Sequence, residues 1–478
     1  MVNVIFINSD TFRRDHLGSY GNDWISTPNL DRFAAESVVF DRAYAASFPT
    51  VPNRLDVLTG RFTFTYRGWA PLAEDALCLP KVLGDAGCTT MMVADTPHIL
   101  QHGYNFQRDF TAYEFIRGQE NGRLHTHPRR PKFPCKVSKV RNGRGTLTWH
   151  LRNRADWKSE ADHYAPRTLR AAADWLEHNH EYGKFFLYVD TFDPHEPWDP
   201  PAYYTEMYDP GYRGEEVTYP RYDFADYLTK AELKHCRAMY AGECTMVDRW
   251  VGKLLAKIDD LGLRENTLVF FTTDHGFLHG EHGIIGKSII RRRTMSYCPL
   301  WEEIARIPLM VRHPKAKGGR RVKALVQPPD IAPTILDAAG ADIPDVMQGQ
   351  SLLPLLRGKV KSIRDVAVTS PALVRDALAA GAYVPSTVTT ARWSLIYSSP
   401  DGTDRRRATT RAVDSLQRRH MSGLFPRLLL YDLKTDPHQK KNVARKHPDV
   451  VRRLHRKYVR LLEDLDTSED CLASRRSL

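Results

Sequence analysis

The sequence predicts an α/β fold, with a mostly parallel central sheet that carries helices on both faces and a small α+β subdomain at the C-terminus. Three observations predict it: short, continuously apolar segments, helix-like segments of crossover length between them, and a change beyond about residue 365 to β-like runs with turn residues. The strand candidates are residues 2–7, 89–94, 184–190, 267–273 and 307–311. Continuous apolar runs of this kind are typical of parallel strands that are buried on both faces.

Two segments between the strand candidates carry clear helix signals. Residues 27–37 read TPNLDRFAAES, in which Thr27 is a candidate N-cap and Pro28 occupies the first turn. A longer helix is predicted from residue 231 to Gly262, where a glycine ends the apolar pattern. Because crossover helices cover the faces of a parallel sheet, we expect a three-layer arrangement.

Two domains are predicted. Residues 1–365 form the main α/β domain, and the basic stretch at about 117–160 has little periodicity and is interpreted as an insertion into it. Residues 366–478 contain β-like runs with turn chemistry, followed by a helix at 449–465. This order predicts a small antiparallel sheet closed by a helix.

The composition is that of a soluble globular protein. Of 478 residues, 42% are hydrophobic and 26% are charged. The chain opens MVNVIFINSD, without a basic segment and apolar run that would form a signal peptide, so we expect a cytoplasmic protein without a membrane span. The seven cysteines are odd in number and include no C-x-x-C pair, which favours reduced thiols over a disulfide framework or a zinc cluster.

The net charge of +12 is concentrated in two basic clusters, residues 123–158 and 405–419. Such clusters can attract nucleic acid, an anionic membrane or an anionic substrate, and the alternative is a solvated loop that is merely basic. No zinc-finger spacing, RNA-binding aromatic motif or heptad accompanies them. Nucleic acid is therefore not expected as the main partner.

Polar residues follow the predicted strands at the edge where ligands bind in such sheets. They are Asp10 after the first strand, Asp190, Asp193 and His195 after the third, and Asp274 and His275 after the fourth. Each of them alone is more often a strand-end cap or a satisfied surface residue. Their recurrence favours convergence of Asp10, Asp274 and His275 on one hard or borderline divalent cation, such as Mg, Mn or Ca.

The stretch SFPTVPNRLDVLTGR at residues 47–61 places Thr50 at the start of an amphipathic helix. A hydroxyl beside a cation and beside the free N–H groups of a helix N-terminus is a candidate nucleophile. Arg54, one turn further on, can reach the same place and neutralise charge. The alternative is that Thr50 only caps the helix, and the residues themselves favour neither interpretation.

Taken in order, these segments resemble the sulfatase family within the alkaline phosphatase superfamily. The matching motifs are VNVIFINSDTFRRDHLGSYG, TVPNRLDVLTGR, HEPWDPP, TTDHGFLHGEHGIIGK and LYDLKTDPHQKKNVA. They cover nearly the whole chain and imply an alkaline-phosphatase-like α/β/α sandwich. The resemblance implies that one divalent metal ion is held by Asp10, Asp274 and His275, and that the catalytic residues are Thr50, Arg54, His195 and Lys287. By the same resemblance, Arg54 supports the nucleophile, and His195 and Lys287 contact the leaving group or the anionic oxygens.

Two departures from the family pattern bear on the chemistry. Active sulfatases carry Cys or Ser at the nucleophile position, oxidised to formylglycine, whereas the Cβ of Thr50 bears a methyl group and cannot become an aldehyde; no formylglycine is expected. In GCTTMMVADTPHIL, where arylsulfatases show G-Y-x-T-x-x-x-G-K-W-H, the chain has Asp95, Thr96 and His98. These resemble the phosphonate monoester hydrolase and phosphodiesterase branch, and we expect them to bind substrate.

Three hypotheses follow. The first is a metal-dependent hydrolase of phosphate or phosphonate mono- or diesters that uses Thr50 as nucleophile. The second is a sulfuric ester hydrolase that works by another route, and the third is a catalytically weak homologue that binds anions. Under the first two hypotheses, the expected substrate is a small or polymeric anionic ester. A homo-oligomer is a further option for the protein's own assembly.

Overall fold

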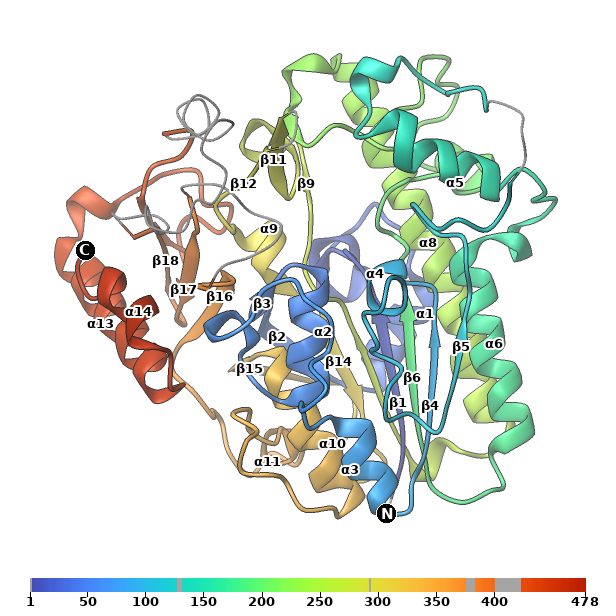
Figure 1. Cartoon of the computed structure of the whole chain (residues 1–478), viewed down its shortest axis with the longest axis horizontal. Helices are drawn as coiled ribbons and strands as arrows, with labels where there is room; N and C mark the ends of the chain where they lie inside the picture. The colour runs from blue at the N-terminus through green and yellow to red at the C-terminus, as the bar shows by residue number, and fades with distance from the viewer. Residues whose placement is uncertain (1, 127–130, 292–293, 375–382, 400–422) are drawn as a thin grey trace.

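The computed structural model describes residues 2–126, 131–291, 294–374, 383–399 and 423–478, and within them nine strands form the central sheet (Figure 1). Their order is β13-β2-β14-β8-β1-β6-β4-β5, with β15 paired to β2. The strands are β1 (Asn3–Ser9), β2 (Val38–Tyr44), β4 (Thr89–Ala94), β5 (Ala112–Phe115), β6 (Phe185–Thr191), β8 (Thr267–Thr272), β13 (Arg306–Ile307), β14 (Leu309–Arg312) and β15 (Arg320–Val326).

The first four predicted strands are confirmed as β1, β4, β6 and β8, and they pair in parallel. The fifth, predicted at residues 307–311, differs: β14 runs antiparallel to both β8 and β2. A continuous apolar run records only that both faces of a strand are buried. Strand direction comes from the path of the connecting segment, so the apolar pattern of β14 could not reveal its orientation.

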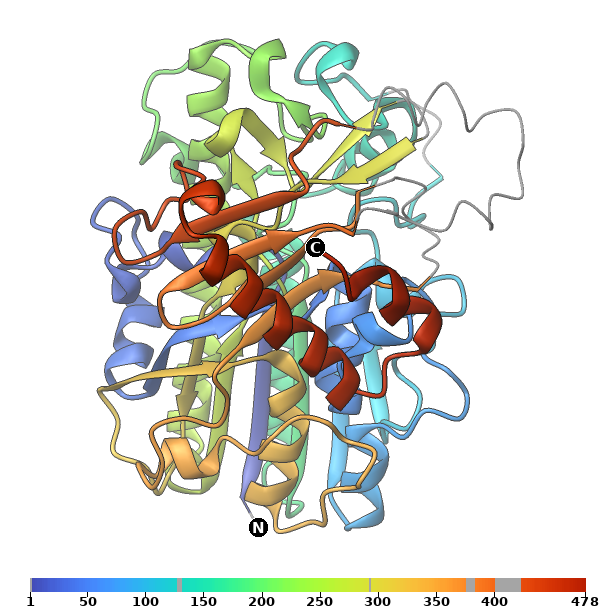
Figure 2. The same cartoon turned by 90° about the vertical axis from the view of Figure 1, so that its left-hand side faces the viewer.

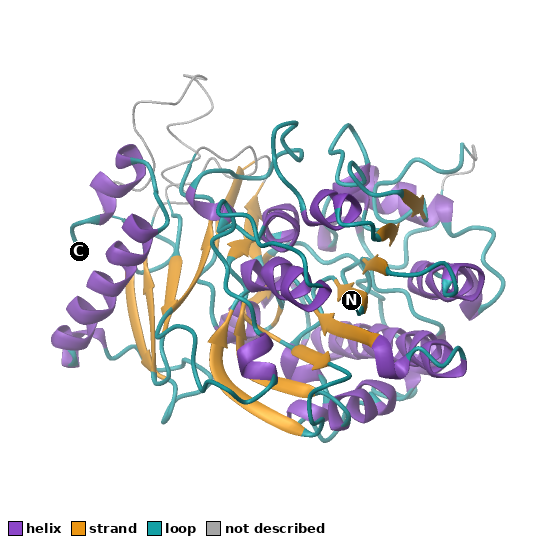
Figure 3. Cartoon of the chain, turned by 90° about the horizontal axis from the view of Figure 1, so that it is seen from below, coloured by secondary structure: helices purple, strands orange, loops and turns teal. Residues whose placement is uncertain are grey.

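Strand β1 shows why helices cover both faces of the sheet. Ile5 and Ile7 pack into a core with α6 (Tyr164–Asn179) and α8 (Lys230–Asp260). Val4 and Phe6, on the opposite face, pack with α2 (Thr50–Thr59), α3 (Leu79–Asp85) and α10 (Ile331–Ala339). Alternate residues of a strand point to opposite faces, so both layers are needed to bury this strand. Figure 3 shows helices on both sides of the sheet, as the sequence predicted.

The two predicted helices form, but one begins differently from the expectation. The segment 231–262 is α8, whose capping box joins Thr229 and Glu232. Helix α1 (Pro28–Ala35) has its proline in the first turn, but the Thr27 hydroxyl makes no cap hydrogen bond. Instead the carboxylate of Asp248 in α8 accepts the N–H groups of residues 29 and 30 at 3.2 and 2.7 Å. A partner distant in sequence has taken over the cap.

The C-terminal residues form a second sheet in the order β19-β18-β17-β16-β3. Its strands are β3 (Ser47–Phe48), β16 (Ala367–Pro371), β17 (Ser386–Thr389), β18 (Trp393–Tyr397) and β19 (Leu428–Asp432). Helix α13 (Pro448–Asp464) packs across this sheet (Figure 2). Strand β3, from just before Thr50, pairs in parallel with β16, so the candidate nucleophile segment is hydrogen-bonded into the C-terminal sheet. The domain boundary at residue 365 stays a prediction.

The remaining elements are short. They are α4 (Pro97–Leu100), α5 (Thr148–Asn153), α7 (Ala202–Glu206), α9 (Glu302–Ala305), α11 (Leu353–Leu356), α14 (Glu469–Leu472), β7 (Asp223–Phe224), β9 (Leu278–His279), β10 (Ile284–Gly286), β11 (Ser288–Arg291) and β12 (Thr294–Tyr297). Helix α5 belongs to the predicted insertion, at the top of Figure 1. The basic cluster at 405–419 lies outside the described residues. All seven cysteines are buried and unpaired, and no described helix has the length and apolarity needed to cross a membrane.

Asp56 fixes the segments on either side of α2. Its fully buried carboxylate accepts the N–H and the hydroxyl of Ser47, both at 2.7 Å, and the N–H of Thr63 at 2.8 Å. Burial raises the pKa of Asp56 to about 7, although the hydrogen bonds from Ser47 and Thr63 oppose the rise. One side chain therefore joins β3, α2 and the loop that follows the helix.

Replacement of Asp56 by asparagine should destabilise the fold. Asp56→Asn puts an NH₂ group opposite donors, and a buried unsatisfied donor costs about 1–3 kcal/mol, so we expect a loss of that size in the free energy of unfolding. Chemical denaturation measures it. The control is Asp85→Asn, which breaks an exposed ion pair with Lys81 and should cost about 1 kcal/mol or less. Equal losses in the two variants would contradict the role given to Asp56.

Candidate active site

Asp10, Asp274 and His275 meet at the carboxyl ends of two neighbouring strands. Strands β1 and β8 pair in parallel, and Asp10 and Asp274 follow their last residues. One potential ligand atom from each of the three side chains lies within 4.8 Å of the others, and all three residues are 0% exposed. In the part of the chain that the structure describes, this is the one group of three or more His, Cys, Asp or Glu side chains with such spacing.

The electrostatics of the cluster fit a divalent cation. Burial and the charge of Asp274 raise the pKa of Asp10 well above its usual value. Asp10 Oδ2 lies 2.9 Å from Arg54 Nη1, yet it accepts no well-aligned hydrogen bond from the described residues. Two buried carboxylates are stable together as anions only when positive charge lies between them. Two carboxylates with one imidazole suit Mg, Mn or Ca, so the residues fit the expected ion.

His275 is oriented for the same role. Its Nδ1 lies 3.0 Å from the carbonyl oxygen of Gly276, to which it donates, so Nε2 carries the lone pair. Burial lowers the pKa of His275 to about 3, which keeps the ring neutral as a ligand must be. A Cβ on Gly276 would lie 1.9 Å from the carbonyl oxygen of Glu303, so only glycine allows this loop to pack so closely.

Arg54 holds the cluster together from helix α2. Its Nη1 contacts both Asp10 and Asp274, while Nε and Nη2 donate to the two oxygens of Asp190 at 3.0 and 2.8 Å. Burial alone would lower the pKa of Arg54, but Asp190, Asp274 and Asp10 outweigh it and raise that pKa well above its usual value. The guanidinium is therefore a permanent buried cation among three carboxylates.

Asp190, which the sequence places at the ligand-binding edge of the sheet without a specific role, is a further functional candidate. Besides Arg54, it accepts the hydroxyl groups of Thr96 at 2.6 Å and Tyr188 at 2.8 Å. Like Asp10, it stands at the end of a buried parallel strand, and that signal was visible in the sequence. What the sequence could not show is that its side chain faces Arg54 and not the metal ligands.

Thr50 begins the helix that carries Arg54, and it is 1% exposed. The first turn of α2 is bonded to the loop that carries Asp274 and His275, because Asn53 Nδ2 donates to the carbonyl oxygen of Asp274 at 3.0 Å. The ring of Phe48 also lies 5.0 Å from that of His275. The N–H groups of a first helical turn have no intrahelical acceptor, so this end of α2 suits an anion.

His195 and Lys287 lie together next to the cluster. Lys287 Nζ is 3.1 Å from His195 Nε2 and 3.2 Å from His275 Nε2. Burial and the charge of Lys287 lower the pKa of His195 well below its usual value. Burial also lowers the pKa of Lys287, against the opposing charges of Asp10 and Asp274. Two groups able to move a proton therefore lie at one side of the candidate metal site.

Thr11, the residue after Asp10, supports the two carboxylates through hydrogen bonds. Its hydroxyl donates to Asp10 Oδ1 at 2.6 Å and its N–H to Asp274 Oδ1 at 3.0 Å. Its φ of 62° is unusual for a β-branched residue. Such backbone outliers concentrate at functional sites, where the surrounding structure enforces them.

The three predicted substrate-binding residues have different surroundings. Asp95 is 0% exposed and accepts hydrogen bonds from the hydroxyls of Thr168 and Thr191 at 2.7 and 3.0 Å. Thr96 reaches the site indirectly, through its hydrogen bond to Asp190. The side chain of His98 is 24% exposed, and its Nε2 lies 3.0 Å from Glu120. Their role in substrate binding stays a prediction, and His98 has the accessibility that it requires.

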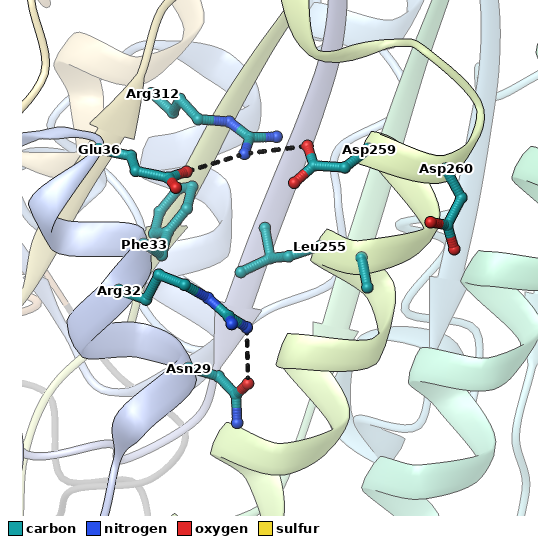
Figure 4. Close-up of a pocket in the computed structure, with 9 residues that line it drawn as sticks. Asn29, Arg32, Phe33, Glu36, Leu255, Asp259, Asp260 and Arg312 are labelled. Atoms are coloured by element: carbon teal, nitrogen blue, oxygen red, sulfur yellow. Dashed lines mark hydrogen bonds and ion pairs between the residues drawn. The ribbon is translucent and has the colours of Figure 1, made fainter.

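A hollow of about 300 Å³ lies elsewhere, between α1 and α8 (Figure 4). It is lined by residues that include Phe33, Leu255 and Arg312, and Arg312 Nη1 lies 3.4 Å from both Glu36 and Asp259. In β14, Arg312 is in register with Val269, near the start of β8. Asp274 follows the other end of β8, so this hollow is at the opposite edge of the sheet from the metal cluster.

The comparison with known proteins agrees with this geometry. The sequence profile of the Sulfatase family matches residues 2–341. The chain belongs to the sulfatase family. An arylsulfatase of Clostridium perfringens is 27% identical over 402 residues, covering 76% of this chain and 80% of that protein. Arylsulfatase K of Homo sapiens is 25% identical over 493 residues, covering 95% of this chain and 81% of its own.

A solved structure confirms the fold. The phosphonate monoester hydrolase of Agrobacterium radiobacter superposes with a TM-score of 0.72 at 20% identity, covering 97% of this chain and 96% of that one. The α/β/α sandwich is therefore the alkaline-phosphatase-like fold that the motifs implied. As a member of the sulfatase family with arylsulfatase relatives, the protein is a hydrolase that acts on anionic esters.

The substitution Asp10→Asn should abolish the stabilisation by metal ions without lowering the stability of the metal-free protein. The variant removes repulsion between buried carboxylates, so in a chelator it should be at least as stable as the wild type. It should lose the stabilisation that Mn, Mg or Ca gives the wild type, about 2.7 kcal/mol at an ion concentration 100 times Kd. Thermal unfolding with a chelator and with each ion measures both effects.

The matched control is Asp248→Asn, which changes another buried carboxylate, the one that caps α1. We expect it to lower the melting temperature and to leave the ion-dependent increment intact. An increment that persists in Asp10→Asn would show that the metal does not bind at this cluster.

Proposed function

We propose that the protein is a metal-dependent hydrolase of phosphate or phosphonate mono- or diesters, with Thr50 as its nucleophile. The observation that carries the proposal is the threonine at the nucleophile position of the family motif, in a first helical turn that is tied to Asp274. Asp10, Asp274 and His275 would hold one divalent ion, of which Mn, Mg and Ca are the candidates. When bound, that ion would supply positive charge that makes a hydroxyl more acidic and shields an anionic ester.

Threonine limits the chemistry at this position. Oxidation of its secondary alcohol gives a ketone and not an aldehyde, so the formylglycine route of active sulfatases is not open to Thr50. A plain threonine sulfate would have to be cleaved by water at sulfur, which is the slow step that the family avoids. A phosphothreonine is hydrolysed by water at phosphorus, and superfamily phosphodiesterases use threonine in this way. Phosphate and phosphonate esters therefore fit Thr50 best.

The neighbouring side chains have complementary tasks in this proposal. The hydroxyl of Thr50 loses its proton to solvent, and its oxygen bonds to phosphorus as the bond to the leaving oxygen breaks. Arg54 remains cationic throughout and offsets the charge of the anionic ester. The leaving oxygen takes a proton from the ammonium group of Lys287, whose Nζ lies 3.1 Å from the acceptor nitrogen Nε2 of His195. Water then hydrolyses the phosphothreonine and restores the free hydroxyl.

Sulfate ester hydrolysis is the second candidate. It is favoured by the arylsulfatases of 25–27% identity. In that case the ester is cleaved by a route in which Thr50 is not converted to formylglycine. The third hypothesis, a homologue that only binds anions, is weaker. Buried like charges such as Asp10 and Asp274 are costly to maintain, and a protein that binds no cation gains nothing from them.

A panel of p-nitrophenyl esters tests the proposal. Sulfate, phosphate monoester, phosphate diester and phenylphosphonate are each assayed with Mn, Mg and Ca. We expect turnover of the phosphorus esters, and a fall of about 10⁴-fold or more in kcat for Thr50→Ala, a loss typical of removing a nucleophile. An acid quench during turnover should trap phosphate on the peptide that contains Thr50.

Thr59→Ala is the matched control. It is the same substitution in the same helix, but the Thr59 hydroxyl donates to the carbonyl oxygen of Leu55 at 2.6 Å within the protein. Activity should survive it. Ester turnover that is unchanged in Thr50→Ala would exclude Thr50 as the nucleophile, and sulfate turnover alone would favour the second candidate. Inactivity on every ester, with metal bound, would favour the anion-binding hypothesis.

A further inference from the structure

Arg141, a member of the basic cluster 123–158, contacts acidic and aromatic side chains near His195, and its side chain is 20% exposed. Its Nη2 is 2.7 Å from Glu196 Oε1 and 3.2 Å from Glu120 Oε1. Its guanidinium lies over the rings of Tyr222 and Tyr219, at 4.1 and 4.5 Å from their centroids. This arginine is therefore committed to a structured network, unlike a charge on a solvated loop.

Glu196 connects Arg141 to His195. Its Oε1 is occupied by Arg141 and by the hydroxyl of Tyr222. Its Oε2 accepts no hydrogen bond from the described residues and lies 3.3 Å from His195 Nδ1. The backbone oxygen of Glu196 is also 2.7 Å from that nitrogen. One oxygen of the carboxylate is thus anchored by the insertion, and the other faces the imidazole.

The other sides of His195 are fixed as well. Its ring stacks on Phe192, with centroids 4.1 Å apart, and its Nε2 lies 3.1 Å from Lys287 Nζ. Lys287 in turn lies 3.2 Å from His275 of the metal cluster. Direct contacts therefore run from Arg141 through Glu196, His195 and Lys287 to the candidate metal site.

We propose that Arg141 is a positioning residue for His195, which it acts on through the side chain of Glu196. The Nδ1–H of His195 is donated to the backbone oxygen of Glu196, and a carboxylate beside that N–H favours the same tautomer and orientation, with Nε2 directed at Lys287. Held by Arg141, Glu196 can serve His195 in this way. The inference rests on the proposed function in one respect, namely that Lys287, held by Nε2 of His195, gives a proton to the leaving oxygen.

The charges of the two glutamates explain why Arg141 is needed. Burial raises the pKa of Glu196, and the charge of Arg141 is the first influence that opposes the rise. Burial would also raise the pKa of Glu120, but His98 and Arg141 bring it to about 2. Glu120 thus has both His98 and Arg141 as partners, while Glu196 depends mainly on Arg141. Removing Arg141 leaves Glu196 as a buried charge without its partner, which is costly.

The test is a kinetic comparison of Arg141→Met and Arg141→Lys with the wild type, on aryl esters of one acid with leaving phenols of increasing pKa. Loss of a group that orients a functional histidine costs about 10–100-fold. We expect Arg141→Met to lower kcat by that amount, with little change in KM. The loss should grow with the pKa of the phenol, because a basic leaving oxygen needs the proton most. Arg141→Lys keeps the charge and should recover part of the activity.

Arg154→Met is the matched control. Arg154 also belongs to the basic cluster and pairs with a buried carboxylate, Asp199, which accepts from His150 as well. We expect this variant to lose stability without a loss of kcat that depends on the leaving group. Losses that are equal for all phenols, or equal in Arg141→Met and Arg154→Met, would overturn the proposal.

A second measurement does not need activity. Nitrogen NMR of ¹⁵N-histidine protein, with the His195 signal assigned through His195→Asn, reports its tautomer. The Nδ1–H form is expected in the wild type and in Arg154→Met, and a shifted or mixed signal in Arg141→Met. An unchanged His195 signal in Arg141→Met would overturn the positioning role. A wild type that hydrolyses no ester contradicts the proposed function alone, and the NMR comparison then decides the role of Arg141.

Discussion

The crowding of buried negative charge around Arg54 is the constraint on which the site depends. Asp10, Asp190 and Asp274 approach one guanidinium from three parallel strands, and water does not reach any of them. One arginine cannot balance three carboxylates, and the raised pKa of Asp10 shows where the shortage of positive charge falls. A divalent cation would remove that shortage. With such an ion bound, all three carboxylates could be ionised at the same time.

Helix α2 must be held firmly, because it brings both Arg54 and Thr50 to this place. Before the helix, β3 is hydrogen-bonded into the C-terminal sheet, and Asp56 joins β3 to the loop beyond the helix. Within its first turn, Asn53 is bonded to the loop of Asp274. The nucleophile candidate is therefore fixed between two sheets. The C-terminal residues contribute to the site through this support, and none of those that the structure describes belongs to the candidate metal cluster.

Local patterns in the sequence were sufficient wherever one strand or one turn carried the information. The runs that became β1, β4, β6 and β8 were found, and so were the carboxylates at their ends, because parallel strands deliver their last residues to one edge. The same reasoning failed for β14, whose direction an apolar run does not record. It failed again at Thr27, where Asp248 from a distant helix supplied the cap.

By itself the sequence determined the family, the sheet, the cluster of Asp10, Asp274 and His275, and the presence of threonine where an aldehyde precursor is usual. Only the tertiary structure decided which partner each remaining polar group contacts. Asp190 binds Arg54, and Asp95 accepts hydrogen bonds from two threonine hydroxyls. Arg141, from the basic cluster, forms an ion pair with Glu196. The physical reason is that a buried charge is stable only beside its partner. Those partners lie scores of residues away, where no local pattern can record them.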